Sequence, residues 1–306
     1  MSKGQALLLI LLIVAVVLTI FLAVFSRSIS DVSVSKQDEE SYRAFSAAEA
    51  GVEKSLLTEN LTFLAPNPLD LGGTAVTGSI APALASSSYV YPLQIVSGDV
   101  ANFWLVDHSA TDGSLVCNLT DHRCTRVRKV KICWGDSSTT SATTPAVELS
   151  VYYLNTDSDY STARVARAAF DPNTSRVPTN GFDSSSLTTA CVINGVNFAF
   201  SKVLALDDLN ITNNAWQNNK VSILQMLRAR MVYADKGQYV GLDISNTGVG
   251  GQNGEYQLLP PQGRTIVSSA TTSTGTSTRK LEVFQPYSDL PPVFDAAVFS
   301  LPGLVK

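Results

Sequence analysis

Apolar residues dominate the beginning of the chain. Residues 6–25 form a run of 20 positions without a charge, and Thr19 is the only polar residue among them. A helix of this length extends about 30 Å, which matches the hydrocarbon core of a bilayer. Because a backbone inside lipid must satisfy its own hydrogen bonds, the run predicts a transmembrane helix over residues 6–25.

The helical pattern continues beyond the apolar run. Residues 26–57 contain no Pro, and Gly51 is their only Gly. One continuous helix over residues 5–57, about 80 Å long, is therefore predicted. Its second half is amphipathic, and the face expected to dock on a globular domain consists of Tyr42, Phe45, Ala48, Glu49, Val52 and Leu56. The alternative is a membrane anchor followed by a separate short helix.

The pattern changes after residue 57. Residues 58–88 contain scattered Pro and Gly and predict a loop-rich connection. From residue 89 onward, alternating apolar and polar positions predict strands, as where Val147, Leu149 and Val151 alternate with polar neighbours. The predicted strands cover 89–96, 102–107, 126–133, 146–154, 164–170, 196–206, 227–234, 239–244, 265–269, 280–285 and 293–299.

These elements together predict an α+β chain with a pilin-like architecture. A long N-terminal transmembrane and amphipathic helix precedes a mostly antiparallel β domain over residues 89–306. The segment 155–195 is the candidate boundary if this domain divides into two smaller β units, and no internal repeat is evident.

Composition narrows the function. Charged residues make up 16% of the chain and the net charge is -4, so no clustered basic surface for nucleic acid is expected. Four cysteines occur without a C-x-x-C pair, and only two histidines accompany them, which supplies a zinc site poorly. Cys117 is predicted to pair with Cys124 across a short polar turn, leaving Cys133 and Cys191 as a second disulfide. Buried free thiols are the alternative.

No catalytic constellation is apparent. The chain lacks a G-x-S-x-G motif, and His108 and His122 lie in polar contexts typical of exposed loops. The glycines at 248–254 do not have nucleotide-binding spacing. Residues 155–160 begin like a calcium loop but lack its Gly at the sixth position and its acid at the twelfth, so a hairpin turn is predicted. We therefore expect no enzyme, no metal and no cofactor.

Two short motifs indicate a family. Lys3 and Gly4 precede the apolar run, and residues 44–53 read AFSAAEAGVE. The first resembles the class III leader of type IV pilins and pseudopilins, and the second is similar to the AF-x-AAEAG signature of PilX-type minor pilins. The resemblance covers about residues 1–57. It implies a leader at residues 1–4, which a prepilin peptidase removes by cutting between Gly4 and Gln5.

The same resemblance implies a place in the cell and a role. The protein would be a single-pass membrane protein with an extracytoplasmic β domain, and it would enter a pilus at the cell surface through helix contacts with other pilin-like subunits. The family usually carries Glu at the fifth mature position, where this chain has Leu9. The expected function is therefore a minor or tip-type structural subunit in pilus assembly. The alternative is a stand-alone membrane-anchored cell-surface binding protein or adhesin.

Overall fold

The apolar run and its polar continuation form one helix, α1 (Lys3–Thr58), without interruption, as the absence of Pro predicts. A computed structural model describes residues 3–58, 68–109, 113–116, 124–125, 127–136, 138–139, 144–156, 159–185, 187–211, 223–245 and 258–289. The chain divides into two compact units, residues 1–81 with 265–285 (unit 1) and residues 82–264 with 286–306 (unit 2).

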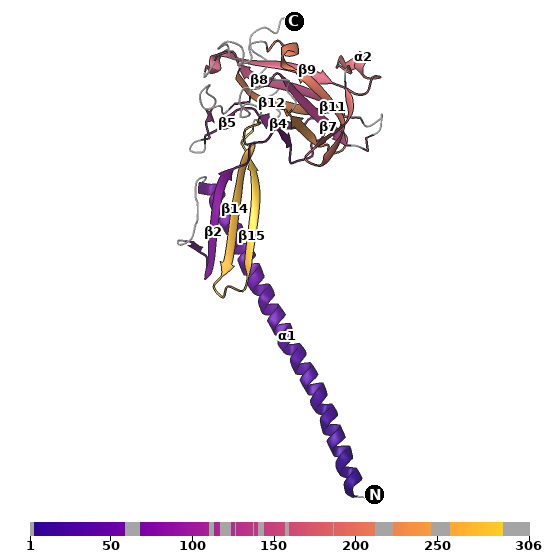
Figure 1. Cartoon of the computed structure of the whole chain (residues 1–306), viewed down its shortest axis with the longest axis vertical. Coiled ribbons are helices and arrows are strands. Elements are labelled where there is room, and N and C mark those ends of the chain that lie inside the picture. The colour runs from indigo at the N-terminus through magenta and orange to yellow at the C-terminus, as the bar shows by residue number, and fades with distance from the viewer. Residues whose placement is uncertain are drawn as a thin grey trace. The chain divides into compact units, whose positions relative to one another are not determined.

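Unit 1 combines α1 with a four-stranded sheet. The strands are β1 (Leu69–Asp70), β2 (Thr74–Pro82), β14 (Gly263–Thr272) and β15 (Thr278–Pro286), and they lie side by side in that order. The sheet runs along the C-terminal half of α1, where β2, β14 and β15 are visible in Figure 1. The sheet thus joins residues near 75 to residues near 270 and 280.

Unit 2 consists of antiparallel β-structure. Sheet order is β10-β11-β7-β13-β3 in one sheet, β4-β12-β8-β9 in the second and β5-β6 in a small third one. The strands are β3 (Ser88–Val90), β4 (Val100–Trp104), β5 (Asp107–His108), β6 (Leu115–Val116), β7 (Lys129–Asp136), β8 (Ala146–Leu154), β9 (Ala163–Phe170), β10 (Thr188–Ile193), β11 (Val196–Ala205), β12 (Ile223–Val232) and β13 (Val240–Asp243). Three short helices connect them: η1 (Tyr160–Thr162), α2 (Val177–Asn180) and η2 (Leu206–Leu209).

The two larger sheets of unit 2 share one core. Trp134 and Leu242 from the first sheet and Phe103, Leu149 and Leu227 from the second belong to a single buried cluster. Such packing of two inner faces is the arrangement of a β-sandwich. The predicted burial of alternate residues in β8 is confirmed, because Val147, Leu149 and Val151 are all fully buried.

Two expectations about chain organisation need correction. The expected loop-rich connection at 58–88 contains β1, β2 and the first residue of β3, because the small residues of β2 alternate between buried and more exposed positions. The candidate boundary at 155–195 lies inside unit 2, because β9 pairs with β8 along its whole length. The turn between those two strands is the hairpin predicted at 155–160, while the strand predicted at 293–299 lies outside the described residues.

Candidate functional site

The N-terminal half of α1 exposes its apolar side chains. Leu11, Phe21 and Val24 are each 65% exposed, and every residue from 10 to 39 is exposed. The hydroxyl of Thr19 donates to the carbonyl oxygen of Val16 at 2.8 Å, so the polar group of this run is satisfied within the helix. The helix is long and apolar enough to cross a bilayer, which makes it a candidate membrane span.

Small side chains form the buried face of the C-terminal half. They recur at spacings of one, three and four residues, and they are Ala44, Ala47, Ala48, Gly51, Val52 and Ser55. Ala47 and Ala48 share a cluster with Val76 of β2 and Ala270 of β14. With so little side-chain volume between them, the sheet lies close to the helix backbone.

Gly51 is where this approach is tightest. A Cβ atom at this position would lie 2.3 Å from Oγ of Ser268 and 2.8 Å from Cγ1 of Val76. Both distances are below normal van der Waals contact, so only glycine fits without movement of β2 or β14. The glycine of the AAEAG motif therefore has a packing role in unit 1.

Size outweighs polarity at this contact. The hydroxyl groups of Ser55, Thr74 and Ser268 are buried, and none has a hydrogen-bond partner in the described part of the chain. An unsatisfied buried hydroxyl costs free energy. Serine and threonine are thus present despite that cost, which is consistent with a contact that admits only small side chains.

Polar contacts at the β14–β15 turn fix the sheet further along α1. The hydroxyl of Thr274 donates to Oε2 of Glu40 at 3.1 Å, and Nε of Arg279 donates to Oγ of Ser41 at 3.0 Å. These two contacts attach the turn one helical turn before the first buried alanine.

The predicted docking face was partly wrong. Ala48 and Val52 are buried as predicted, but Tyr42 is 74% exposed, and Phe45, Glu49 and Leu56 are exposed as well. The prediction favoured large apolar residues, whereas the sheet packs on the small ones. The spacing of the alanines around Gly51 was the signal that would have identified the correct face.

The residues of the predicted leader lie in the first turns of α1. Gly4, Gln5 and Leu9 are helical, and their roles in cleavage and assembly stay predictions.

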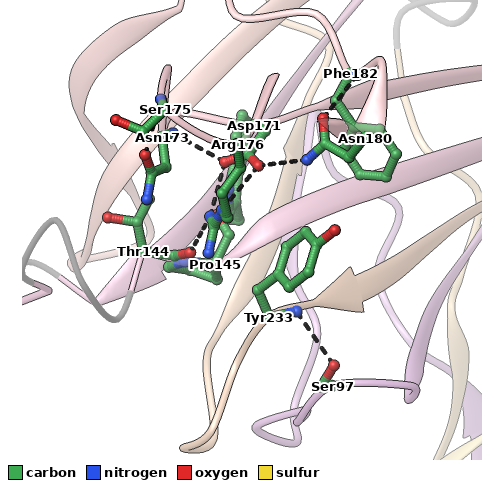
Figure 2. A network of polar contacts seen from close by, with 11 residues as sticks. Ser97, Thr144, Pro145, Asp171, Asn173, Ser175, Arg176, Asn180, Phe182 and Tyr233 are labelled. Atoms are coloured by element: carbon green, nitrogen blue, oxygen red, sulfur yellow. Dashed lines mark hydrogen bonds and ion pairs between the residues drawn. The ribbon is translucent and has the colours of Figure 1, made fainter. Parts of the chain in front are cut away.

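A buried carboxylate organises one end of unit 2 (Figure 2). Asp171, directly after β9, is completely buried and accepts two hydrogen bonds from Arg176, at 2.8 and 3.0 Å. Nδ2 of Asn180 donates to the same carboxylate at 2.8 Å, and Nη2 of Arg176 donates to the carbonyl oxygen of Thr144 at 2.6 Å. The guanidinium also lies 4.3 Å from the ring centre of Tyr233.

This network has the properties of a structural cross-link. The charge of Asp171 is matched by Arg176 in a bidentate pair, and the backbone N–H of Asn173 donates to the same carboxylate at 2.8 Å. Tyr233 adopts a left-handed conformation with φ of 60°, which is costly for an aromatic residue. The contacts hold the segment after β9 against the strands that precede β8 and follow β12, and sequence reasoning did not single out any of these residues.

His108 corrects a further expectation. It was predicted to be an exposed loop histidine, but it lies in β5, is 7% exposed and packs edge-on against Trp104 with ring centres 4.5 Å apart. Burial lowers its pKa to about 4; the carboxylate of Asp107 opposes this shift, and Arg264 adds to it. His122 lies outside the described residues, as does the glycine-rich segment 248–254.

The cysteines form disulfides where the structure describes them. Cys133 of β7 is bonded to Cys191 of β10, which confirms the predicted second pair. Cys124 is also disulfide-bonded, but Cys117 lies outside the described residues, so its pairing with Cys124 stays a prediction.

The described residues contain no group of three His, Cys, Asp or Glu side chains arranged to hold a metal ion. The features that combine into a candidate site are therefore those of α1: an exposed apolar half and a half whose small-residue face is covered by a sheet. Comparison of the chain with family models, curated proteins and solved structures yields no match.

Proposed function

We propose that the protein is a minor or tip-type structural subunit of a type IV pilus or pseudopilus system. The observation that carries the proposal is the division of α1 into two halves. Its first half is apolar all round and exposed from residue 10 onward, whereas its second half is covered on one face by the sheet of unit 1. A helix that is apolar on all sides needs lipid or other apolar helices around it.

Both environments belong to the proposed function. Before assembly the apolar half lies in the membrane, and after assembly it packs against the helices of other pilin-like subunits. Unit 2 then faces outward with the extracytoplasmic surface. The leader resemblance at Lys3 and Gly4 and the AAEAG motif support this assignment over a simple anchor.

The residue at position 9 favours a minor subunit. In the resembling family, a Glu at the fifth mature position pairs with the terminal amine of a neighbouring subunit, and this chain has Leu9 there. An unpaired ammonium in an apolar filament core is costly. At a tip only one side of the subunit must match a neighbour, so the requirement is relaxed.

The test combines processing with stoichiometry. N-terminal sequencing of the membrane-extracted and filament-associated protein should find Gln5 as the first residue. Quantification in sheared filaments should place the protein far below the main subunit. A mature protein that keeps Met1 and never co-purifies with filaments would instead support the alternative, a stand-alone membrane-anchored surface-binding protein or adhesin.

A further inference from the structure

Charged side chains on the polar half of α1 divide between two sides of the helix. With 100° of rotation per residue, Asp31, Asp38 and Phe45 fall on one side, about 110° from the centre of the buried face. Lys36, Arg43 and Ala50 fall about the same angle away on the other side. The first three, with Glu49, are called the acidic flank, and the second three, with Lys54, are called the basic flank.

These charges are available to a partner. Asp31, Lys36, Asp38 and Arg43 are all exposed. None of the four forms an ion pair with any residue in the described part of the chain. Phe45, on the acidic flank, is 41% exposed despite its large apolar ring. Lys54 is engaged in another interaction and is not needed below.

The two flanks share one spacing. Asp31 precedes Lys36 by five residues, Asp38 precedes Arg43 by five, and Phe45 precedes Ala50 by five. Five residues rotate a helix by about 140°, so the members of each pair point away from each other within one chain. On two parallel helices displaced by five residues, about 7.5 Å, all three pairs would instead lie level.

We propose that α1 docks on a second copy of this chain, in parallel orientation, with the acidic flank of one copy against the basic flank of the next and a displacement of five residues. Asp31 and Asp38 then face Lys36 and Arg43 of the neighbour. The ring of Phe45 faces the small side chain of Ala50. An exposed ion pair is weak by itself, so the repetition at two successive levels and the apolar contact act together.

The register follows from the same residues. Without displacement, Lys36 would lie near the level of Asp38, but Asp31 and Arg43 would have no opposite charge at their level. Parallel orientation follows from the proposed function, on which the inference rests, because both copies enter the membrane by the same end. The contact uses different surfaces on the two copies, so it extends as a row. Within a minor subunit's role, it places at least two copies next to each other.

Cysteine cross-linking in the full-length protein tests the register. Cells that produce Asp38→Cys and Arg43→Cys chains with different tags are treated with a mild oxidant, and mixed dimers are identified by mass mapping of the new disulfide. The matched control is Asp38→Cys with Lys36→Cys, which uses the same two flanks about 10 Å out of level. We expect dimers from the first combination and their loss in the control.

A second pair guards against a poorly folded variant. Asp31→Cys with Lys36→Cys should also cross-link, and it reports on charge reversal elsewhere in the contact. Asp38→Arg should reduce this cross-link, and Asp38→Arg with Arg43→Asp in the same chain should restore it. A merely structural role for Asp38 would not produce the rescue.

The outcomes separate this inference from the proposed function. Equal or stronger cross-linking of the control, or no cross-link from either matched pair, overturns the five-residue contact. Filament association without matched cross-links supports the proposed function alone. Matched cross-links in a protein that is never found in filaments support the helix contact and contradict the pilus role.

Discussion

The imidazole ring of His108 is stacked on the phenol ring of Tyr287, with the ring centres 3.8 Å apart and the planes 18° from parallel. His108 is part of β5, and Tyr287 directly follows β15. The backbone N–H of Tyr287 also donates to the carbonyl oxygen of Gln262 at 3.4 Å. The stack therefore holds the chain at the point where it returns into unit 2 after β15.

This stack should weaken in acid. Burial lowers the pKa of His108 from 6.5 to about 4, so the unfolded chain binds a proton at a higher pH than the folded protein does. The stability contributed by neutral His108 is complete above pH 6.5 and is lost as the pH falls toward 4. The groups around the ring are Trp104, Asp107, Arg264 and Tyr287.

The measurement is thermal unfolding of the detergent-solubilised full chain, followed by tryptophan fluorescence. His108→Gln should show a smaller decrease in Tm between about pH 7 and about pH 4.5 than the native protein, because glutamine does not titrate. Carboxylates elsewhere contribute equally to both proteins, so the difference isolates His108. An identical decrease in the two proteins would contradict the prediction.

Asp171→Ala should destabilise unit 2 strongly. The change leaves the guanidinium of Arg176 without its buried partner, which costs about 3 kcal/mol in comparable sites. Arg167→Ala is the matched control, because it breaks an exposed ion pair with Glu148 and should cost less than about 1 kcal/mol. Denaturant unfolding of both variants gives the comparison, and similar losses would show that the Asp171 network is not a cross-link.

Gly51→Val should separate the sheet of unit 1 from α1. The added side chain overlaps Ser268 and Val76, and overpacking of this kind costs about 1–3 kcal/mol. Ser46→Val places the same side chain on an exposed position of the same helix and should have little effect. Limited proteolysis provides the readout: faster cleavage within β14 and β15 is expected for the first variant only.

Removing the Cys133–Cys191 disulfide should lower stability by about 2–4 kcal/mol, since the bond closes a long loop in the unfolded chain. Both cysteines are buried beside Phe198 and Ile193, so the double change to alanine also removes some packing. Unfolding of the native protein with and without reductant separates the two effects. A double variant as stable as the oxidised native protein would refute this estimate.

Gly4→Leu should block removal of the predicted leader. A full-length, membrane-bound precursor is expected, because a bulky side chain prevents close approach of the peptidase to the backbone. The companion variant Leu9→Glu leaves the cleavage position intact and should be processed, while its level in filaments should change. Normal processing of Gly4→Leu would contradict the pilin-like leader.

The sequence was most informative where one physical requirement dominates. An uncharged run of bilayer length and the absence of Pro predicted the whole of α1, and strict alternation predicted β8 with its correct ends. It was least informative where small residues carry the structure. Strand β2 contains Gly78, two alanines and a terminal Pro82, which resemble a loop, and its pairing partner β14 is far away in the sequence.

The candidate site shows the same limit. Apolar size identified Tyr42 and Leu56 as buried, but the space between α1 and the sheet admits only side chains like those of Ala47 and Gly51. The burial of His108 depends on Trp104 and on Tyr287, which is distant in the sequence. No local pattern encodes such a contact, so only the fold reveals it.

The sheet of unit 1 also sets the order in which the protein is able to fold. Its strands come from residues 69–82 and from residues 263–286, and contacts between segments so far apart form late because the long intervening chain must first be synthesised and brought together. The alanines of α1 therefore remain uncovered while most of the protein is being made. Only a chain that has been translated nearly to its end is able to cover them, so truncated products keep a sticky helix and complete ones do not.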